Sequence, residues 1–222
     1  IFIHKTKKIK NSPFVSHNVR PLPVQINSTT LRVFFASRLK DDIPSPNYVD
    51  VDINNPEKIK KINKKKIINL GKLGSFDADG ITFTQIIPLK KNYLIQYSGW
   101  KRSRYKMTID MGIGYIIANK KLTNFKKISE GPIIHKDFFN PYGASASYIL
   151  KDKKKFNLYY CPIIKWIKAE HDYEMIYTIY KGVSDNLYDW KFEKKPLIKQ
   201  KFSSEVISAP EVLKINGKYY MW

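Results

Sequence analysis

Four polar side chains of kinds that exchange protons occupy one repeated position in this sequence. The aromatic residues Phe35, Tyr97 and Tyr160 end three similar segments, at a spacing of about 63 residues. The position about 18 residues before each of them holds His17, Asp79 or Tyr142, and Glu205 stands one period after Tyr142. The residue type at this position varies among polar residues, whereas the segments that follow stay apolar. This variation favours a chemical role for the position over a role in packing.

The carboxylates of this set, with the neighbouring Asp77, are the candidate catalytic residues: Asp77, Asp79 and Glu205. Two carboxylates across a narrow channel suit the hydrolysis of a glycosidic bond, in which one is a protonated acid and the other a base or nucleophile. We predict that Asp79 and Glu205 lie roughly 5 to 10 Å apart, the span used by hydrolytic pairs. In the alternative interpretation, Asp77 and Asp79 form Asx turns that lead Gly80 into a strand, and Glu205 caps a turn.

The two acids of the proposed pair have different surroundings in the sequence. Glu205 precedes the apolar residues Val206 and Ile207, and an apolar environment favours the neutral form of a carboxyl group. Asp79 lies in a Gly-rich loop where backbone amides and water can stabilise an anion. The sequence therefore predicts Glu205 as the general acid and Asp79 as the ionised partner.

A repeated hairpin pattern positions these residues. Each repeat has an apolar run, a short polar turn and an aromatic-rich return strand, and the return strands recur at the same regular period. The hairpins are expected at 19–37, 81–97, 144–161 and 207–222. A regular period with a strand pair at the start of each unit predicts a β-propeller.

The repeat also predicts blade boundaries. Blade one is expected at about 19–70, blade two at about 81–134, blade three at about 144–198, and a fourth blade begins at about 206–222. Their outer strands are expected at 62–70, 125–134 and 190–198. Closed propellers need about four to eight blades, so we expect about three and a quarter blades of a longer chain. The segment 1–10 either completes the last blade or is a frayed tail.

In a propeller the innermost strands line a central channel, and the loop before each of them lies at its mouth. The side chains at the repeated position should therefore converge on one polar site. Trp100 and Tyr142 could offer aromatic faces for stacking sugar rings, or pack the rim. His17 is either a ligand contact or a structural histidine.

The composition narrows the classes of partner. The chain has 222 residues, of which 43% are hydrophobic and 14% aromatic, enough for one all-β domain. No apolar run reaches about 18 residues, which argues against a membrane span. The single cysteine, Cys161, favours a reducing compartment such as the cytoplasm. No spacing of ligands fits a zinc site, and no nucleotide fingerprint occurs, so no metal or cofactor is expected.

The formal net charge of +21 could indicate nucleic-acid binding, but most of it comes from lysine. The arginines are Arg20, Arg32, Arg38, Arg102 and Arg104. Because two-point recognition of bases and phosphates favours arginine, this balance argues against nucleic acid. The charge would still attract acidic partners, including anionic glycans or lipid head groups.

Two segments resemble a known clan. SAPEVLKINGKYYMW, at 208–222, resembles a hairpin of family 43 glycoside hydrolases. SDNLYDWK, at 184–191, resembles the S-x-D-G-x-x-W element of that clan, which includes invertase and levansucrase relatives. The blade entrances SHNVRPLPV, GSFDADG and SSEVISAPEV most closely resemble an uncharacterised group of glycosidase-like propellers. The resemblance implies a five-bladed propeller with a carbohydrate or glycoconjugate as its ligand.

The sequence departs from the family at one catalytic position. Family 43 enzymes carry a base Asp within an Asp-Pro dipeptide at the start of the first inner strand, where this chain has Arg20-Pro21. Together with Arg20, the candidate substrate-binding residues are His17, Trp100 and Tyr142. The missing aspartate supports an alternative, a glycan-binding propeller without catalysis. A third hypothesis is a protein-interaction platform that uses the Lys-rich rim.

Overall fold

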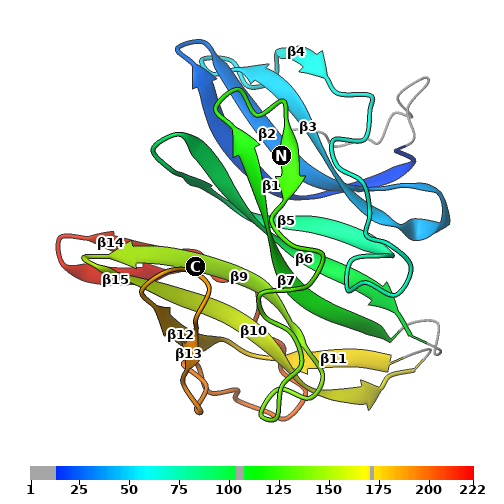
Figure 1. Ribbon diagram of the computed structural model, residues 1–222, viewed down its shortest axis with the longest axis vertical. Helices are drawn as coiled ribbons and strands as arrows, with labels where there is room; N and C mark the ends of the chain where they lie inside the picture. Colours follow the sequence, from blue (N-terminus) through cyan, green and yellow to red (C-terminus); the bar gives the residue numbers. More distant parts are fainter. Residues whose placement is uncertain (1–13, 104–107, 171–172) are drawn as a thin grey trace.

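The computed structural model describes residues 14–103, 108–170 and 173–222, which form antiparallel sheets arranged as a fan (Figure 1). The predicted role of the segment 1–10 lies outside the described residues. Within the described ranges, no helix is long and apolar enough to cross a membrane.

The sheets follow one another along the chain. The first contains β1 (Ser16–Asn27), β2 (Thr30–Arg38), β3 (Pro44–Asp52) and β4 (Ile59–Ile62), with a short 3-10 helix, η1 (Lys40–Asp42), between β2 and β3. The second contains β5 (Gly80–Pro88), β6 (Asn92–Arg102), β7 (Ile109–Asn119) and β8 (Phe125–Lys127). The third contains β9 (Ala144–Asp152), β10 (Lys155–Lys168), β12 (Tyr180–Ser184) and β13 (Lys191–Phe192), and β11 (Tyr173–Tyr177) pairs with the distal half of β10. The hairpin β14 (Val212–Ile215) and β15 (Lys218–Met221) follows.

The first strands of the sheets lie together at the centre of the fan. β1 contacts β5, β5 contacts β9, and β9 contacts β14. In the first two sheets, each later strand lies one place further out. We call the space around these four first strands the hub. Sheets of four strands that radiate from one hub have the arrangement of a β-propeller.

The outer strands are shorter than the sequence predicts. The predicted strands 62–70, 125–134 and 190–198 correspond to β4 at 59–62, β8 at 125–127 and β13 at 191–192. An outer strand has a pairing partner on one side only, and short edges are a common way to avoid unwanted pairing. The apolar residues Ile67, Ile68 and Leu70 pack against the core instead of extending the first sheet.

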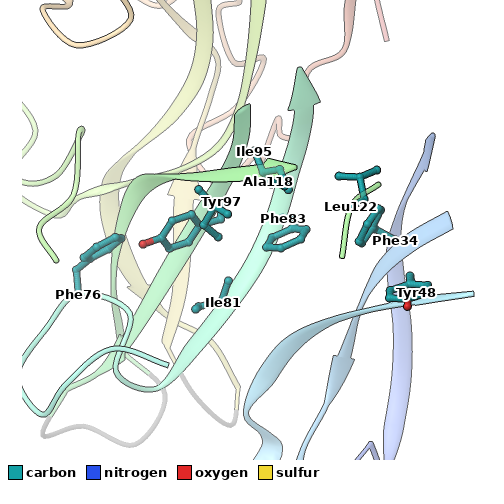
Figure 2. Close-up of a cluster of buried hydrophobic side chains, with 10 residues drawn as sticks. Phe34, Tyr48, Phe76, Ile81, Phe83, Ile95, Tyr97, Ala118 and Leu122 are labelled. Carbon is teal, nitrogen blue, oxygen red and sulfur yellow. The ribbon is translucent and has the colours of Figure 1, made fainter. Parts of the chain in front are cut away.

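Apolar side chains fill the space between the first two sheets (Figure 2). Phe34 of β2 lies 5.9 Å from Phe83 of β5 between ring centroids. Along β6 the side chains alternate: Ile95 and Tyr97 belong to this cluster, whereas Leu94 belongs to the cluster between the second and third sheets. This two-residue period buries both faces of the second sheet.

Glycines make room for one aromatic side chain from the loop before β5. Phe76 stacks on Tyr97 with a centroid distance of 5.6 Å, as Figure 2 shows. A Cβ atom added at Gly99, Gly112 or Gly114 would lie 2.5, 3.0 or 2.7 Å from the Phe76 ring. These glycines of β6 and β7 therefore form a recess that only a bare backbone leaves open for Phe76.

We predict that Gly114→Ala lowers the free energy of unfolding by about 1 to 3 kcal/mol, because the new methyl group must displace Phe76 or Tyr97. Urea unfolding followed by far-UV circular dichroism measures the change. Gly131→Ala is the matched control, since its nearest side-chain atom would lie 3.8 Å away. Equal stabilities of the two variants would mean that the recess does not constrain the fold.

Candidate functional site

In three of the repeats, the backbone of the innermost segment bends at the same position. Arg20, Ala146 and Ala209 have φ values of 57°, 46° and 57°, and their positions are related by whole repeats of about 63 residues. The register of β1 shifts around Arg20, and that of β9 shifts around Ala146. Residues other than glycine seldom adopt this left-handed backbone conformation. Register shifts of this kind are β-bulges, which commonly redirect side chains beside functional sites.

The electrostatic surroundings of Arg20 include groups from other sheets. Its charge interacts with Cys161 of β10, Tyr177 of β11 and Glu211 before β14. Arg20 belongs to the first sheet, and these residues belong to the third sheet and the segment before the hairpin, so the charge of Arg20 acts on groups across the hub. Burial lowers the pKa of Arg20, and the negative charge of Glu211 acts in the opposite direction. Among the described residues, the Arg20 guanidinium makes no hydrogen bond or ion pair.

Tyr148 joins the same cluster from β9. Burial raises the pKa of Tyr148, and the charge of Glu211 adds to this effect. The backbone of Glu211 is held by two hydrogen bonds with Trp222, at 3.1 and 3.0 Å, directly before β14. We call Arg20, Tyr148, Tyr177 and Glu211 the hub cluster.

The hub cluster offers one cation, one carboxylate and two phenols. The guanidinium can donate five hydrogen bonds, the carboxylate can accept several, and each phenol can do both. Within the described part of the chain, no group of three or more His, Cys, Asp or Glu side chains could hold a metal ion. The groups of the hub cluster can exchange hydrogen bonds with hydroxyl groups.

Asp77 lies elsewhere and is engaged in structural contacts. Its buried carboxylate accepts hydrogen bonds from Tyr97 and Ser75, both at 3.0 Å, and pairs with Lys127 at 2.6 Å. It lines a cavity of about 620 Å³ between the segments 66–72 and 125–130, at the outer strand of the second sheet. Burial and the charge of Asp77 raise the pKa of Tyr97, which keeps the phenol protonated as the donor.

The other two candidate acids accept hydrogen bonds from backbone amides. Asp79 Oδ2 accepts a hydrogen bond at 2.8 Å from the backbone amide of Arg102, the last residue of the return strand β6. Glu205 Oε2 accepts one from the backbone amide of Lys201 at 2.5 Å and so closes its own turn. The bond of Glu205 matches the turn-capping alternative, whereas the bond of Asp79 joins the loop before β5 to β6. The close approach of the two carboxylates stays a prediction.

The remaining candidate binding residues lie at the edges of the sheets. His17 is exposed near the start of β1, and its ring accepts or donates a hydrogen bond with Ser16 at 2.8 Å. Trp100 lies in β6 at the end of the pairing between β5 and β6. The guanidinium of Arg38 lies 4.9 Å from the centroid of the Trp100 ring. Tyr142 is 42% exposed in the loop before β9, where its ring is accessible to a ligand.

Sequence reasoning missed three members of the hub cluster: Tyr148, Tyr177 and Glu211. A signal for two of them was present, because the period that relates the hairpins also relates another set. That set is Leu22, Gln85, Tyr148 and Glu211. Leu22, Tyr148 and Glu211 lie two positions after the three bends, and Gln85 holds the same position in the second repeat. Three of the four residues are polar.

No family model matches the chain. A curated protein of Mycobacterium tuberculosis strain H37Rv, the uncharacterized protein Rv1502, is 25% identical over 211 residues, which cover 93% of this chain and 68% of that protein.

Solved structures show the fold. The chain is similar to a glycoside hydrolase, with a TM-score of 0.67 and 12% identity over 91% of this chain, and it spans 63% of that structure's length. It is also similar to the endo-arabinase of Bacteroides thetaiotaomicron, with a TM-score of 0.61, 16% identity and coverage of 99% and 73% of the two chains. The Bombyx mori GH32 beta-fructofuranosidase BmSUC1 gives a TM-score of 0.62 and 12% identity, with coverage of 92% and 42%. The predicted fold is thus confirmed: the chain has the all-β propeller fold of these glycoside hydrolases.

We predict that Asp77→Asn lowers the free energy of unfolding by about 2 to 4 kcal/mol, because it leaves Lys127 without its buried partner. The control is Glu130→Gln, which breaks a pair with Lys72 whose side chains are 77% and 80% exposed and should cost less than about 1 kcal/mol. Normal stability with lost activity would instead give Asp77 the catalytic role.

Cys161 should be chemically inert in the folded protein. Burial raises the pKa of its thiol to about 11, so the reactive thiolate is scarce at pH 8. We expect a disulfide reagent such as dithiobis(nitrobenzoate) to leave the native protein unmodified at pH 8 and to react with one thiol per chain in guanidinium chloride. Native labelling as fast as that of free cysteine would show an accessible thiol.

Proposed function

We propose that the protein binds a carbohydrate at the hub, as a propeller of glycosidase type. The observation that supports the proposal is the hub cluster, in which the charge of Glu211 acts on both Arg20 and Tyr148. The similar solved structures, which include an endo-arabinase and a beta-fructofuranosidase, support a sugar ligand.

The chemistry of the cluster matches that of a sugar. Sugar hydroxyl groups donate hydrogen bonds to a carboxylate such as Glu211 and accept them from a guanidinium such as Arg20. Hydrogen bonds to charged groups are shorter and stronger than those between neutral groups. The rings of Tyr148 and Tyr177 add apolar area against the faces of a sugar ring and keep a polar end.

Hydrolysis is the second candidate function, and the fold of the similar structures favours it. The usual mechanism needs two carboxyl groups, about 5 to 10 Å apart, on either side of the glycosidic bond. The hub cluster contributes Glu211, whereas Arg20 stands where family 43 enzymes have their base. Asp79 and Glu205 are the proposed partners for a second carboxylate. Because the cluster holds one acid and one cation, its described residues support binding more directly than catalysis.

We predict that Glu211→Gln weakens sugar binding by the full-length protein about 10-fold or more, because a neutral amide replaces a charged acceptor. A glycan array identifies a ligand, and isothermal titration calorimetry then measures its affinity. The matched control is Glu193→Gln, which removes an exposed carboxylate that lies 3.6 Å from Lys181 on the third sheet.

Hydrolysis is tested with the same variants. Release of nitrophenol from aryl glycosides that stops in Asp79→Asn or Glu205→Gln, with binding retained, would establish the carboxylate pair. Sugar binding without turnover, lost in Glu211→Gln, would support the binding function. If affinity is unchanged in Glu211→Gln, the hub cluster is not the binding site.

A further inference from the structure

The second and third sheets place one repeated phenylalanine differently. Phe76 and Phe139 are related by one repeat of about 63 residues. Phe76 is 5% exposed, because the glycines of β6 and β7 leave a recess for its ring. Phe139 is 68% exposed. The third sheet therefore leaves at the surface a ring that the second sheet buries.

Side chains close the recess in the third sheet. Pro162 lies one repeat after Gly99, and Tyr180 holds the register position of Gly114. A Cβ atom at either glycine would lie 2.5 or 2.7 Å from the Phe76 ring. Proline and tyrosine carry that atom and more, so the recess of the third sheet has no room for a phenylalanine ring.

A cavity of about 340 Å³ lies beside the displaced ring. It is bounded by the loop 137–141 and by the strands β10, β12 and β13. Its aromatic lining residues are Phe139, Tyr160, Tyr180 and Phe192. The ring centroid of Tyr160 lies 5.0 Å from that of Phe192 and 6.3 Å from that of Tyr180. We call this cavity the aromatic pocket.

Hydrogen bonds hold the loop that carries Phe139. The Asp137 carboxylate accepts bonds from the backbone amides of Phe139 and Asn140, both at 2.7 Å. It also accepts one from the side-chain amide of Asn140 at 2.9 Å. The ring is therefore held in place before a ligand binds, and such pre-organisation lowers the entropic cost of binding.

The lining combines apolar walls with a few polar groups, as pockets for small organic ligands do. The Lys194 ammonium group, 5.3 Å from the Phe139 ring centroid, can donate hydrogen bonds, and the side-chain carbonyl of Asn140 can accept them. The Glu193 side chain pairs with Lys181 at 3.6 Å on the opposite face of the sheet, because successive side chains of a strand alternate between faces. A sugar ring fits this lining, since it has an apolar face for aromatic rings and hydroxyl groups for the polar contacts.

We propose that the aromatic pocket binds one ring of an oligosaccharide whose neighbouring residues reach the hub. The inference rests on the proposed function and names the class of its ligand. The pocket strands lie one to three places from β9 in the third sheet. At a strand spacing of about 4.8 Å, the pocket is roughly 5 to 15 Å from the hub strand. Tyr142, which is 42% exposed, continues the aromatic surface along the chain from the loop toward β9.

The test measures affinity against chain length on the full-length protein by calorimetry. The probes are glucose, xylose and arabinose and the linear oligosaccharides of each. We expect at least one oligosaccharide to bind about 10-fold or more tightly than its monosaccharide, because a second linked ring adds contacts at little further entropic cost. Phe139→Ala should remove this gain and leave the monosaccharide affinity within about 3-fold, whereas Phe139→Tyr, which keeps an aromatic face, should retain it.

Phe138→Ala is the matched control. It removes the same side chain from the same loop, at a residue that is 92% exposed and does not line the aromatic pocket. The oligosaccharide affinity of this variant should stay within about 3-fold of the wild type. Both alanine variants should unfold at the wild-type urea concentration, because both rings are exposed.

The outcomes separate the subsite from the proposed function. Equal affinity for monosaccharide and oligosaccharide, or an unchanged gain in Phe139→Ala, would overturn the subsite and leave carbohydrate binding at the hub standing. An equal loss in Phe138→Ala would assign the sugar to the loop surface and not to the pocket. N-acetylphenylalanine amide tests the other occupant, a side chain of a protein partner: binding that is tighter than that of every sugar and lost in Phe139→Ala would overturn the sugar assignment. If no sugar binds, the proposed function fails together with its subsite.

Discussion

First strands that meet at a hub need hydrogen-bond partners for the backbone groups on their free edges. The second and third sheets satisfy this need through side chains. The amide of Gln85 donates to the carbonyl oxygen of Ile149 at 2.8 Å and accepts from its backbone amide at 2.7 Å. Ser98 Oγ likewise accepts from the amide of Ala146 at 3.3 Å. Polar side chains of β5 and β6 thus supply the bonds that the hub edge of β9 would otherwise lack.

The same repeated position serves structure in one sheet and ligand chemistry in the next. Gln85 holds β9 in place, while its counterparts Tyr148 and Glu211, one and two repeats later, lie in the hub cluster. A polar residue at this position is therefore necessary wherever the hub edge needs a partner or the ligand needs a contact. Residue type alone cannot distinguish these two roles, since both require hydrogen-bonding groups inside apolar strands.

This ambiguity explains how far the sequence could predict the molecule. The hairpins and their period followed from alternating apolar residues, because burial of both faces of a sheet such as the second imposes that alternation. The lengths of the outer strands could not be predicted in this way, because the length of an edge strand is limited by its missing partners rather than by its own residues. At the site, Asp79 and Glu205 were indistinguishable in sequence from turn-capping acids. The backbone bend at Arg20 was not predicted, because no side-chain pattern encodes it.

The acidic loop before β5 owes its composition largely to packing. Phe76 occupies the recess formed by the glycines of β6 and β7. The next residue, Asp77, is thereby held in contact with Tyr97 and Lys127. A buried carboxylate is stable only with such partners, so the contacts fix the loop at its outer end. Gly80 begins β5 three residues later, which means that the same contacts fix the register of β5 and hence the place of Gln85. The contacts of Asp77 with the outer strand thus determine where Gln85 lies in β5. Gln85 in turn positions β9, the strand that carries Tyr148.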